Sequence, residues 1–172
     1  QSVGPINFTA NTGGSETFNW TNDNTTVGLA GSGSGGIPAY VAPPNLTGSN
    51  FFANLTVTAT KNGCVSSIMT FKITIKPQPV VTAIADITKC PGQSVGPVSF
   101  VANTGGAEVF NWTNDNPAIG LAASGVGNIS SYLAPANLTG SPNVANISVT
   151  AVKNGCTSAP KTFIITINPQ PV

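Results

Sequence analysis

Acidic side chains are the first residues to consider for catalysis, because the 172-residue chain contains no histidine. Each half of the chain carries one pair at the same spacing, Glu16 with Asp23 and Glu108 with Asp115. Two carboxylates can serve as the acid and the base of a glycosidase. Here, however, each pair flanks a segment expected to be a strand with a tryptophan at its centre. We therefore predict no enzymatic activity and no cofactor.

The most polar recurring motif is Asn-Trp-Thr-Asn-Asp-Asn, which occupies residues 111–116 and, in the first half, residues 19–24. Its oxygen atoms are the kind of ligand that calcium prefers. Each motif offers a single carboxylate, whereas several usually converge on calcium. We therefore favour a turn in which Asp115 or Asn114 bonds to its own backbone, and predict no metal site. Calcium near Asp23 or Asp115 stays open as an alternative.

A tandem repeat organises the chain. Residues 1–80 align with residues 93–172 at a constant offset of 92, without a gap, and 53 of the 80 positions are identical. The intervening residues 81–92 are expected to form the first strand of the second copy. We therefore predict two domains: residues 1–80, which lack a first strand, and residues 81–172. The chain resembles a slice from a longer array.

Three cysteines, Cys64, Cys90 and Cys156, could form a disulfide. Cys64 and Cys156 are equivalent, and the counterpart of Cys90 would lie before Gln1, so Cys64 is expected to be free by truncation. An immunoglobulin-like topology is expected to place Cys90 and Cys156 at the same end of one domain. Cys64 would lie a strand length away, roughly 30 Å, whereas a disulfide tolerates about 7 Å between Cα atoms. We predict a Cys90–Cys156 bridge, with reduced structural thiols as the alternative.

Such a bridge would have thermodynamic and mechanical consequences. Closing a loop of about 66 residues stabilises a domain by roughly 4 kcal/mol in the loop-entropy model. A structural disulfide also indicates an oxidising compartment outside the cytosol. Under tension, the bridge would shield residues 91–155 from extension.

Alternating apolar residues predict the strands that position these side chains. Residues 146–152 place Ile147, Val149 and Ala151 on one face, and residues 162–167 repeat the pattern. Asn154-Gly155 between them is a strong hairpin signal. Trp112 and its counterpart Trp20 each share a strand face with a phenylalanine and are predicted to be core aromatic residues. We predict an all-β protein of two tandem immunoglobulin-like (PKD-like) β-sandwich domains.

Composition excludes several classes of partner. Only 6% of residues are charged and the formal net charge is +1, without a basic cluster. Such a surface offers nothing to attract nucleic acid or an anionic membrane. No apolar run approaches the ~18 residues of a spanning helix, so we expect no membrane insertion.

The recurring motifs together resemble a known family of repeats. They are the Cys-Pro-Gly-Gln-Ser-Val-Gly-Pro run at residues 90–97, the motif at 111–116, Lys-Asn-Gly-Cys at 153–156 and Asn-Pro-Gln-Pro at 168–171. This set is similar to the PKD-like, Ig-like repeats of giant Bacteroidetes cell-surface adhesins, including SprB-type gliding-motility adhesins. The Trp-Asp-Phe-Gly-Asp signature of ordinary PKD domains is missing, so their properties are not transferred.

The resemblance implies a function and a location. It implies export by type IX secretion and display on the cell surface as long filaments that contact surfaces or polysaccharide. We expect a structural repeat of an extracellular adhesin stalk, whose partners are neighbouring repeats of the same chain and surface polysaccharide. The alternative is a weak multivalent carbohydrate-binding module, which would need exposed aromatic residues recurring on one face.

Overall fold

The structure is a computed structural model that describes residues 1–171. It divides into two compact units, Gln1–Pro77 and Gln78–Val172, here called unit 1 and unit 2. Strands and turns build both units, and the only helical elements in the described residues are two short 3-10 turns, Thr25–Val27 and Pro117–Ile119. None of these is long or apolar enough to cross a membrane. The predicted all-β class is confirmed.

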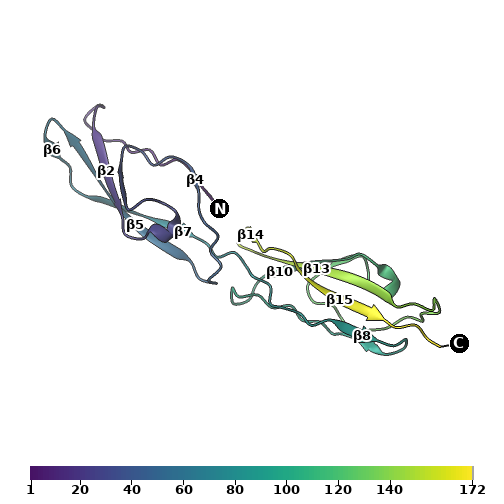
Figure 1. Cartoon of the computed structure of the whole chain (residues 1–172). Coiled ribbons are helices and arrows are strands. Elements are labelled where there is room, and N and C mark those ends of the chain that lie inside the picture. The colour runs from purple at the N-terminus through teal and green to yellow at the C-terminus, as the bar shows by residue number, and fades with distance from the viewer. Residues whose placement is uncertain (172) are drawn as a thin grey trace. The chain divides into compact units, whose positions relative to one another are not determined.

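Unit 1 contains one main sheet and one two-stranded pair (Figure 1). The main sheet has the order β3-β2-β5-β6, with β7 also pairing with β5, and β1 pairs with β4. All of these pairings are antiparallel. The strands are β1 (Ser2–Val3), β2 (Thr17–Asn22), β3 (Ser32–Ser34), β4 (Tyr40–Val41), β5 (Phe51–Lys61), β6 (Cys64–Val65) and β7 (Met69–Ile75).

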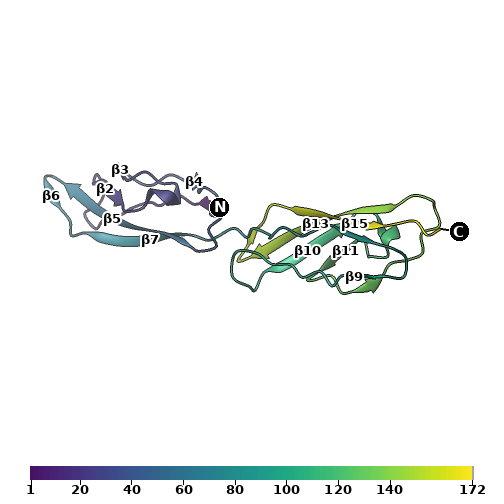
Figure 2. The ribbon, with the colours of Figure 1, turned by 60° about the horizontal axis from the view of Figure 1, so that its bottom comes forward.

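Unit 2 repeats this arrangement and adds one strand, β8. Its main sheet has the order β11-β10-β13-β15-β8, with β14 on β13, and β9 pairs with β12. Figure 2 shows β10, β13 and β15 running along the unit. The strands are β8 (Ile87–Lys89), β9 (Ser94–Val95), β10 (Val109–Asn114), β11 (Ser124–Val126), β12 (Tyr132–Leu133), β13 (Asn143–Lys153), β14 (Cys156–Thr157) and β15 (Lys161–Ile167).

The predicted alternation produces the core of each sandwich. Ile147, Val149 and Ala151 point inward from β13 and are fully buried, as the pattern of two requires. The β13–β14 turn uses Asn154 and Gly155 with φ of 51° and 79°, the left-handed region that Asn-Gly tolerates. The core lies between the main sheet and a looser second layer, which includes the β9–β12 pair and the Val98–Ile129 bridge.

The first strand of unit 2 pairs with the last strand in parallel. Residues 87–89 of β8 lie beside residues 165–167 of β15, and the Asn168 amide donates to the Lys89 carbonyl at 2.9 Å. Just upstream, Val81 bridges to Ala102 in the second layer. Residues 81–89 therefore connect the two layers of unit 2.

A glycine opposite each tryptophan makes room for the indole. Trp20 on β2 faces Gly33 on β3, and the same pair recurs as Trp112 and Gly125. A Cβ added at Gly33 would lie 2.2 Å from Cζ2 of Trp20. Both tryptophans are buried, at 6% and 7% exposure, and belong to the cores.

Replacing Gly33 with alanine tests this packing. We expect Gly33→Ala to destabilise unit 1 by about 1–3 kcal/mol, because the methyl group displaces the indole from a filled core. The matched control is Gly31→Ala, whose added Cβ would meet nothing closer than 3.9 Å. Urea unfolding followed by Trp20 fluorescence, in a Trp112→Phe background, measures the difference. Equal stability of the two variants would contradict the packing argument.

Candidate functional site

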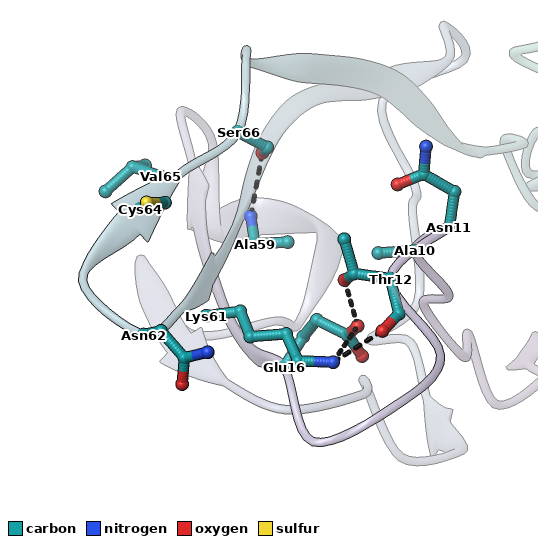
Figure 3. Close-up of a pocket in the computed structure, with 10 residues that line it drawn as sticks. All are labelled: Ala10, Asn11, Thr12, Glu16, Ala59, Lys61, Asn62, Cys64, Val65 and Ser66. Atoms are coloured by element: carbon teal, nitrogen blue, oxygen red, sulfur yellow. Dashed lines mark hydrogen bonds and ion pairs between the residues drawn. The ribbon is translucent and has the colours of Figure 1, made fainter.

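A lysine at the end of β5 holds the Asn-Thr-Gly-Gly turn of unit 1. Nζ of Lys61 donates to the carbonyl oxygens of Thr12 and Gly14, the latter at 2.7 Å, and lies 3.7 Å from Glu16. The Glu16 carboxylate accepts from the Thr12 hydroxyl (Figure 3). It also accepts from the Gly14 amide. Lys61 therefore binds carbonyl oxygens of this turn, while Glu16 binds a hydroxyl and an amide of the same turn.

The same cluster recurs in unit 2 with Lys153, Glu108 and Thr104. The Glu16 and Glu108 side chains are only 6% and 4% exposed. The hydrogen bond from Thr12 holds the pKa of Glu16 below its usual value. Burial raises the pKa of Glu108, but the hydrogen bond from Thr104, the local backbone amides and the charge of Lys153 together lower it by more. The net shift of the pKa is therefore downward. Both carboxylates are thus held in the charged form.

Sequence reasoning missed this cluster, although a signal for it was present. Lys61 and Glu16 recur at the offset of 92, inside motifs that are otherwise preserved. Their separation along the chain hid the contact, because only the β2–β5 pairing brings residue 17 opposite residue 60.

The aspartate of the Asn-Trp-Thr-Asn-Asp-Asn motif clamps two strands together. Asp115 accepts from the backbone amide and the side-chain amide of Asn146, both at 2.7 Å, and Asp23 does the same with Asn54. The side-chain amide bond is the larger cause of the lowered pKa of Asp115. Asn116 caps the following 3-10 turn by accepting from the Ala118 amide. The motif is a turn in which Oδ1 of Asn114 accepts from the backbone amide of Asn116 at 3.0 Å, one of the two predicted bonds, whereas the main partner of Asp115 is Asn146 on β13.

The paired carboxylates lie too far apart for glycosidase chemistry. Glu16 precedes β2 and Asp23 follows it, so seven extended residues, or about 23 Å, separate them. A glycosidase needs its two carboxyl groups within roughly 5–10 Å. No group of three or more histidine, cysteine, aspartate or glutamate side chains within residues 1–171 is placed to hold a metal ion.

The structure places Cys90 and Cys156 at opposite ends of unit 2. Cys90 follows the end of β8, which lies level with the end of β15 and the start of β13. Cys156 pairs with Lys153 at the other end of β13. The end of β13 beside Cys90 and the end beside Cys156 are ten residues apart along the strand, or about 33 Å. Figure 1 shows β14 and β8 at the two ends of the unit.

The predicted Cys90–Cys156 bridge is therefore wrong for this sheet. The error lay in the direction of the first strand, which runs parallel to β15 and so carries Cys90 away from the hairpin. Cys64 and Cys90 are exposed free thiols, and Cys156 is half-buried. The prediction that a disulfide shields residues 91–155 from extension depended on this bridge and is wrong for the same reason.

Aromatic residues do not form a recurring exposed surface in the described residues. Within residues 1–171, Phe52 is the only exposed aromatic side chain, at 47%, and its counterpart in unit 2 is Val144. Tyr40 and Tyr132 are half-buried with buried hydroxyl groups, and burial raises the pKa of both. A repeated sugar-stacking platform is thus not present among residues 1–171.

An open groove with a volume of about 570 Å³ lies beside the Lys61–Glu16 cluster in unit 1. Figure 3 shows Ala10, Asn11 and Thr12 facing Cys64, Val65 and Ser66 across it. A smaller hollow of about 270 Å³ shares Ala10, Ala59 and Ser66 and continues toward Phe8 and Phe18. Residues of both walls are apolar or neutral, apart from the Lys61–Glu16 cluster.

Comparison with known proteins adds little to this geometry. No family model matches the chain, and no curated protein matches it. Among solved structures, the crystal structure of the FN1–FN3 domains of chicken CNTN1 is similar at 10% sequence identity, with a TM-score of 0.33. The alignment covers 89% of this chain and 56% of that one. The function must therefore be argued from the chain's own residues.

Replacing Cys90 with serine tests the cysteine geometry. We expect Cys90→Ser to change the stability of unit 2 by less than about 0.5 kcal/mol, as for an ordinary surface substitution. Chemical unfolding without reductant, followed by Trp112 fluorescence, measures it. The opposite result would be a Cys90→Ser chain about 4 kcal/mol less stable than the parent chain, with the difference disappearing when reductant is added. That result would support a Cys90–Cys156 bridge.

Acid should weaken the aspartate clamp. Hydrogen bonds from Asn146 hold the pKa of Asp115 below its usual value in the folded chain, so its contribution to stability is present above the usual pKa and is lost as the pH falls through the folded one. We expect Asp115→Asn to destabilise unit 2 at pH 7, and the difference from the parent chain to shrink as the pH falls below about 4, the ordinary pKa of an aspartate carboxyl. Urea unfolding between pH 2 and 7 checks this. A constant difference across that range would show that the carboxylate charge contributes nothing.

Proposed function

We propose that the chain is a pair of spacer units from the stalk of an extracellular adhesin, which extends a binding region from the cell surface and bears force in adhesion or gliding. The observation that carries this proposal is the parallel pairing of β8 with β15 in unit 2. The resemblance of the motifs to PKD-like adhesin repeats supports the cell-surface location and type IX export.

Parallel first and last strands resist tension in a specific way. A pull on the chain before β8 draws that strand toward the hairpin end of unit 2, while a pull after β15 draws β15 the other way. The two strands must then slide past each other, so the hydrogen bonds between them are loaded together rather than one at a time. The bonds of Val80 and Thr82 to residues 101–103 add further resistance.

The surface chemistry supports a spacer rather than a binding module. A carbohydrate-binding module would need aromatic side chains exposed at equivalent places in both units, and the described residues offer Phe52 in one unit and Val144 in the other. A low charge leaves the surface weakly steered toward charged partners. Neighbouring repeats and surface polysaccharide are the partners consistent with a stalk.

A proline at residue 89 tests the load-bearing pairing. The Lys89 carbonyl faces β15, and the backbone amide of Lys89 points to the same side of the strand. The substitution Lys89→Pro removes this amide hydrogen. We expect Lys89→Pro to lower the peak force for unfolding unit 2, which releases roughly 320 Å of chain. Lys89→Ala, which keeps the amide, should retain the force of the parent chain. Single-molecule stretching of the 172-residue chain between handle domains measures all three.

Equal peak forces for Lys89→Pro and Lys89→Ala would overturn the mechanical argument. Glycan-array binding by the parent chain would then support the carbohydrate-binding alternative. If the units belong to a stalk, the peak force should depend on residue 89, and the two units should bind no glycan on the array.

A further inference from the structure

Residues 78–82 of unit 2, here called the entry segment, are held by both layers of the unit. Nε2 of Gln78 donates to the Thr157 carbonyl on β14, in the main sheet, at 2.7 Å. Val80 forms two hydrogen bonds with Asn103 in the second layer: its amide donates to Oδ1 of Asn103 at 2.8 Å, and its carbonyl accepts from the Asn103 amide at 3.2 Å. The start of the entry segment is therefore attached to two different parts of the unit.

The entry segment and β8 are bonded independently of each other. The Thr82 amide donates to the Val101 carbonyl at 2.8 Å, and the next backbone pairing along the chain is that of β8 with β15. Within residues 1–171, no backbone–backbone hydrogen bond joins residues 83–86 to the rest of the chain. Oδ1 of Asp86 accepts from the Ile164 amide on β15 at 2.7 Å, so this contact belongs to the β8 side. The entry segment can therefore separate from unit 2 while β8 stays paired.

Lys153, at the end of β13, supports the first attachment through its backbone. Lys153 pairs with Cys156, and Val152 pairs with Thr157, across the β13–β14 turn. The residues on either side of Thr157 bond to β13, so the Thr157 carbonyl faces the other edge of β14. At that edge it accepts from the Gln78 side chain. The hairpin that Lys153 closes therefore presents the acceptor for the entry segment.

The side chain of Lys153 supports the second attachment. Its Nζ donates to the carbonyls of Thr104 and Gly106, the latter at 2.7 Å, in the turn that begins at Asn103. Residues 105–107 have φ of 80°, 94° and 62°, so the turn contains three successive left-handed residues, one of them an alanine. Removal of the ammonium group would leave both carbonyls of this strained turn without their donor. The Lys153 side chain therefore determines where the turn lies, and Asn103 with it.

We propose that the entry segment is a latch that opens and closes while the rest of unit 2 stays folded, and that Lys153 keeps it closed. The backbone and the ammonium group of Lys153 position the two acceptors of the latch, the Thr157 carbonyl and Oδ1 of Asn103. Burial of Val81, which is 5% exposed, favours the closed state.

The state of the latch determines how much of the chain between the units is fixed. An open latch releases residues 78–86 as flexible chain that precedes β8, and a closed latch holds them on unit 2. Lys153 thus controls the freedom of the connection between the two units from within unit 2. This inference does not depend on the adhesin function.

Native-state hydrogen exchange of the 172-residue chain, followed by NMR, tests the proposal. In the parent chain we expect the Val80 and Thr82 amides to be less protected than two reference amides. The references are Asn168, which donates to the Lys89 carbonyl beside β8, and Ile147, which is fully buried in β13. Exchange of the latch amides should also respond little to urea, because a local opening exposes little surface.

Replacing Lys153 with methionine tests its role in the latch. Lys153→Met keeps the apolar stem of the side chain and removes its three donors. We expect exchange of the Val80 and Thr82 amides to accelerate at least about tenfold more than exchange of the Ile147 amide, because hydrogen bonds to a charged group are lost beneath the latch. Lys161→Met, at an exposed position of β15, is the matched control and should leave all of these amides unchanged.

Two further variants separate positioning from general stabilisation. Asn103→Ala removes the Oδ1 acceptor, so Lys153→Met should accelerate the Val80 amide less in an Asn103→Ala chain than in the parent chain. Gln78→Ala removes the other attachment without a change in the core. It should accelerate exchange of the Val80 amide and leave the Ile147 amide unchanged, and it serves if Lys153→Met does not fold.

Four results would overturn the proposal. In the parent chain, Val80 and Thr82 amides as protected as the Ile147 amide would mean that the latch opens only on global unfolding. Equal acceleration of the latch and reference amides in Lys153→Met would mean a general structural role. Unchanged exchange of the Val80 amide in that variant, or an equal effect of Lys153→Met with and without Asn103→Ala, would mean that the ammonium group does not position the latch.

Discussion

Coverage of one apolar sheet face is the constraint on which each unit depends. The 11-residue strands β5 and β13 direct alternate side chains to that face, and these residues are stable only where something shields them from water. In unit 2 the shield includes residues 80–89, which touch the second layer first and then join the main sheet. Apolar burial and strand pairing therefore come from the same short segment.

Local patterns in the sequence predicted the central hairpin and the core well. Alternation at Ile147, Val149 and Ala151 and the Asn154-Gly155 turn are local signals, and burial follows from them directly. The direction of the first strand has no such signal, because parallel and antiparallel neighbours use the same apolar residues. That direction alone decides which end of unit 2 carries Cys90, and hence whether Cys156 is within reach. Contacts such as Lys61 with Thr12 were hidden for a related reason: they depend on strand register over a long loop.

Buried asparagine side chains, rather than charged ones, form hydrogen bonds with backbone groups of the loops in this fold. Asn137 is 1% exposed and donates to the carbonyls of Ser141 and Ile167, while its Oδ1 accepts from Thr139. Asn45 does the same in unit 1. A neutral amide satisfies buried backbone groups in irregular segments without the desolvation cost of an ion. A chain with only 6% charged residues can therefore keep long loops ordered.

The central sheet is built in the same way in both units. The main sheet of unit 1 keeps β2, β5 and β7 in the same register as their counterparts in unit 2. The register of the central sheet is thus the same in both units. In unit 2, residues 80–89 both pack on the core and pair with β15, so the segment proposed to bear load is also the segment that shields the sheet face.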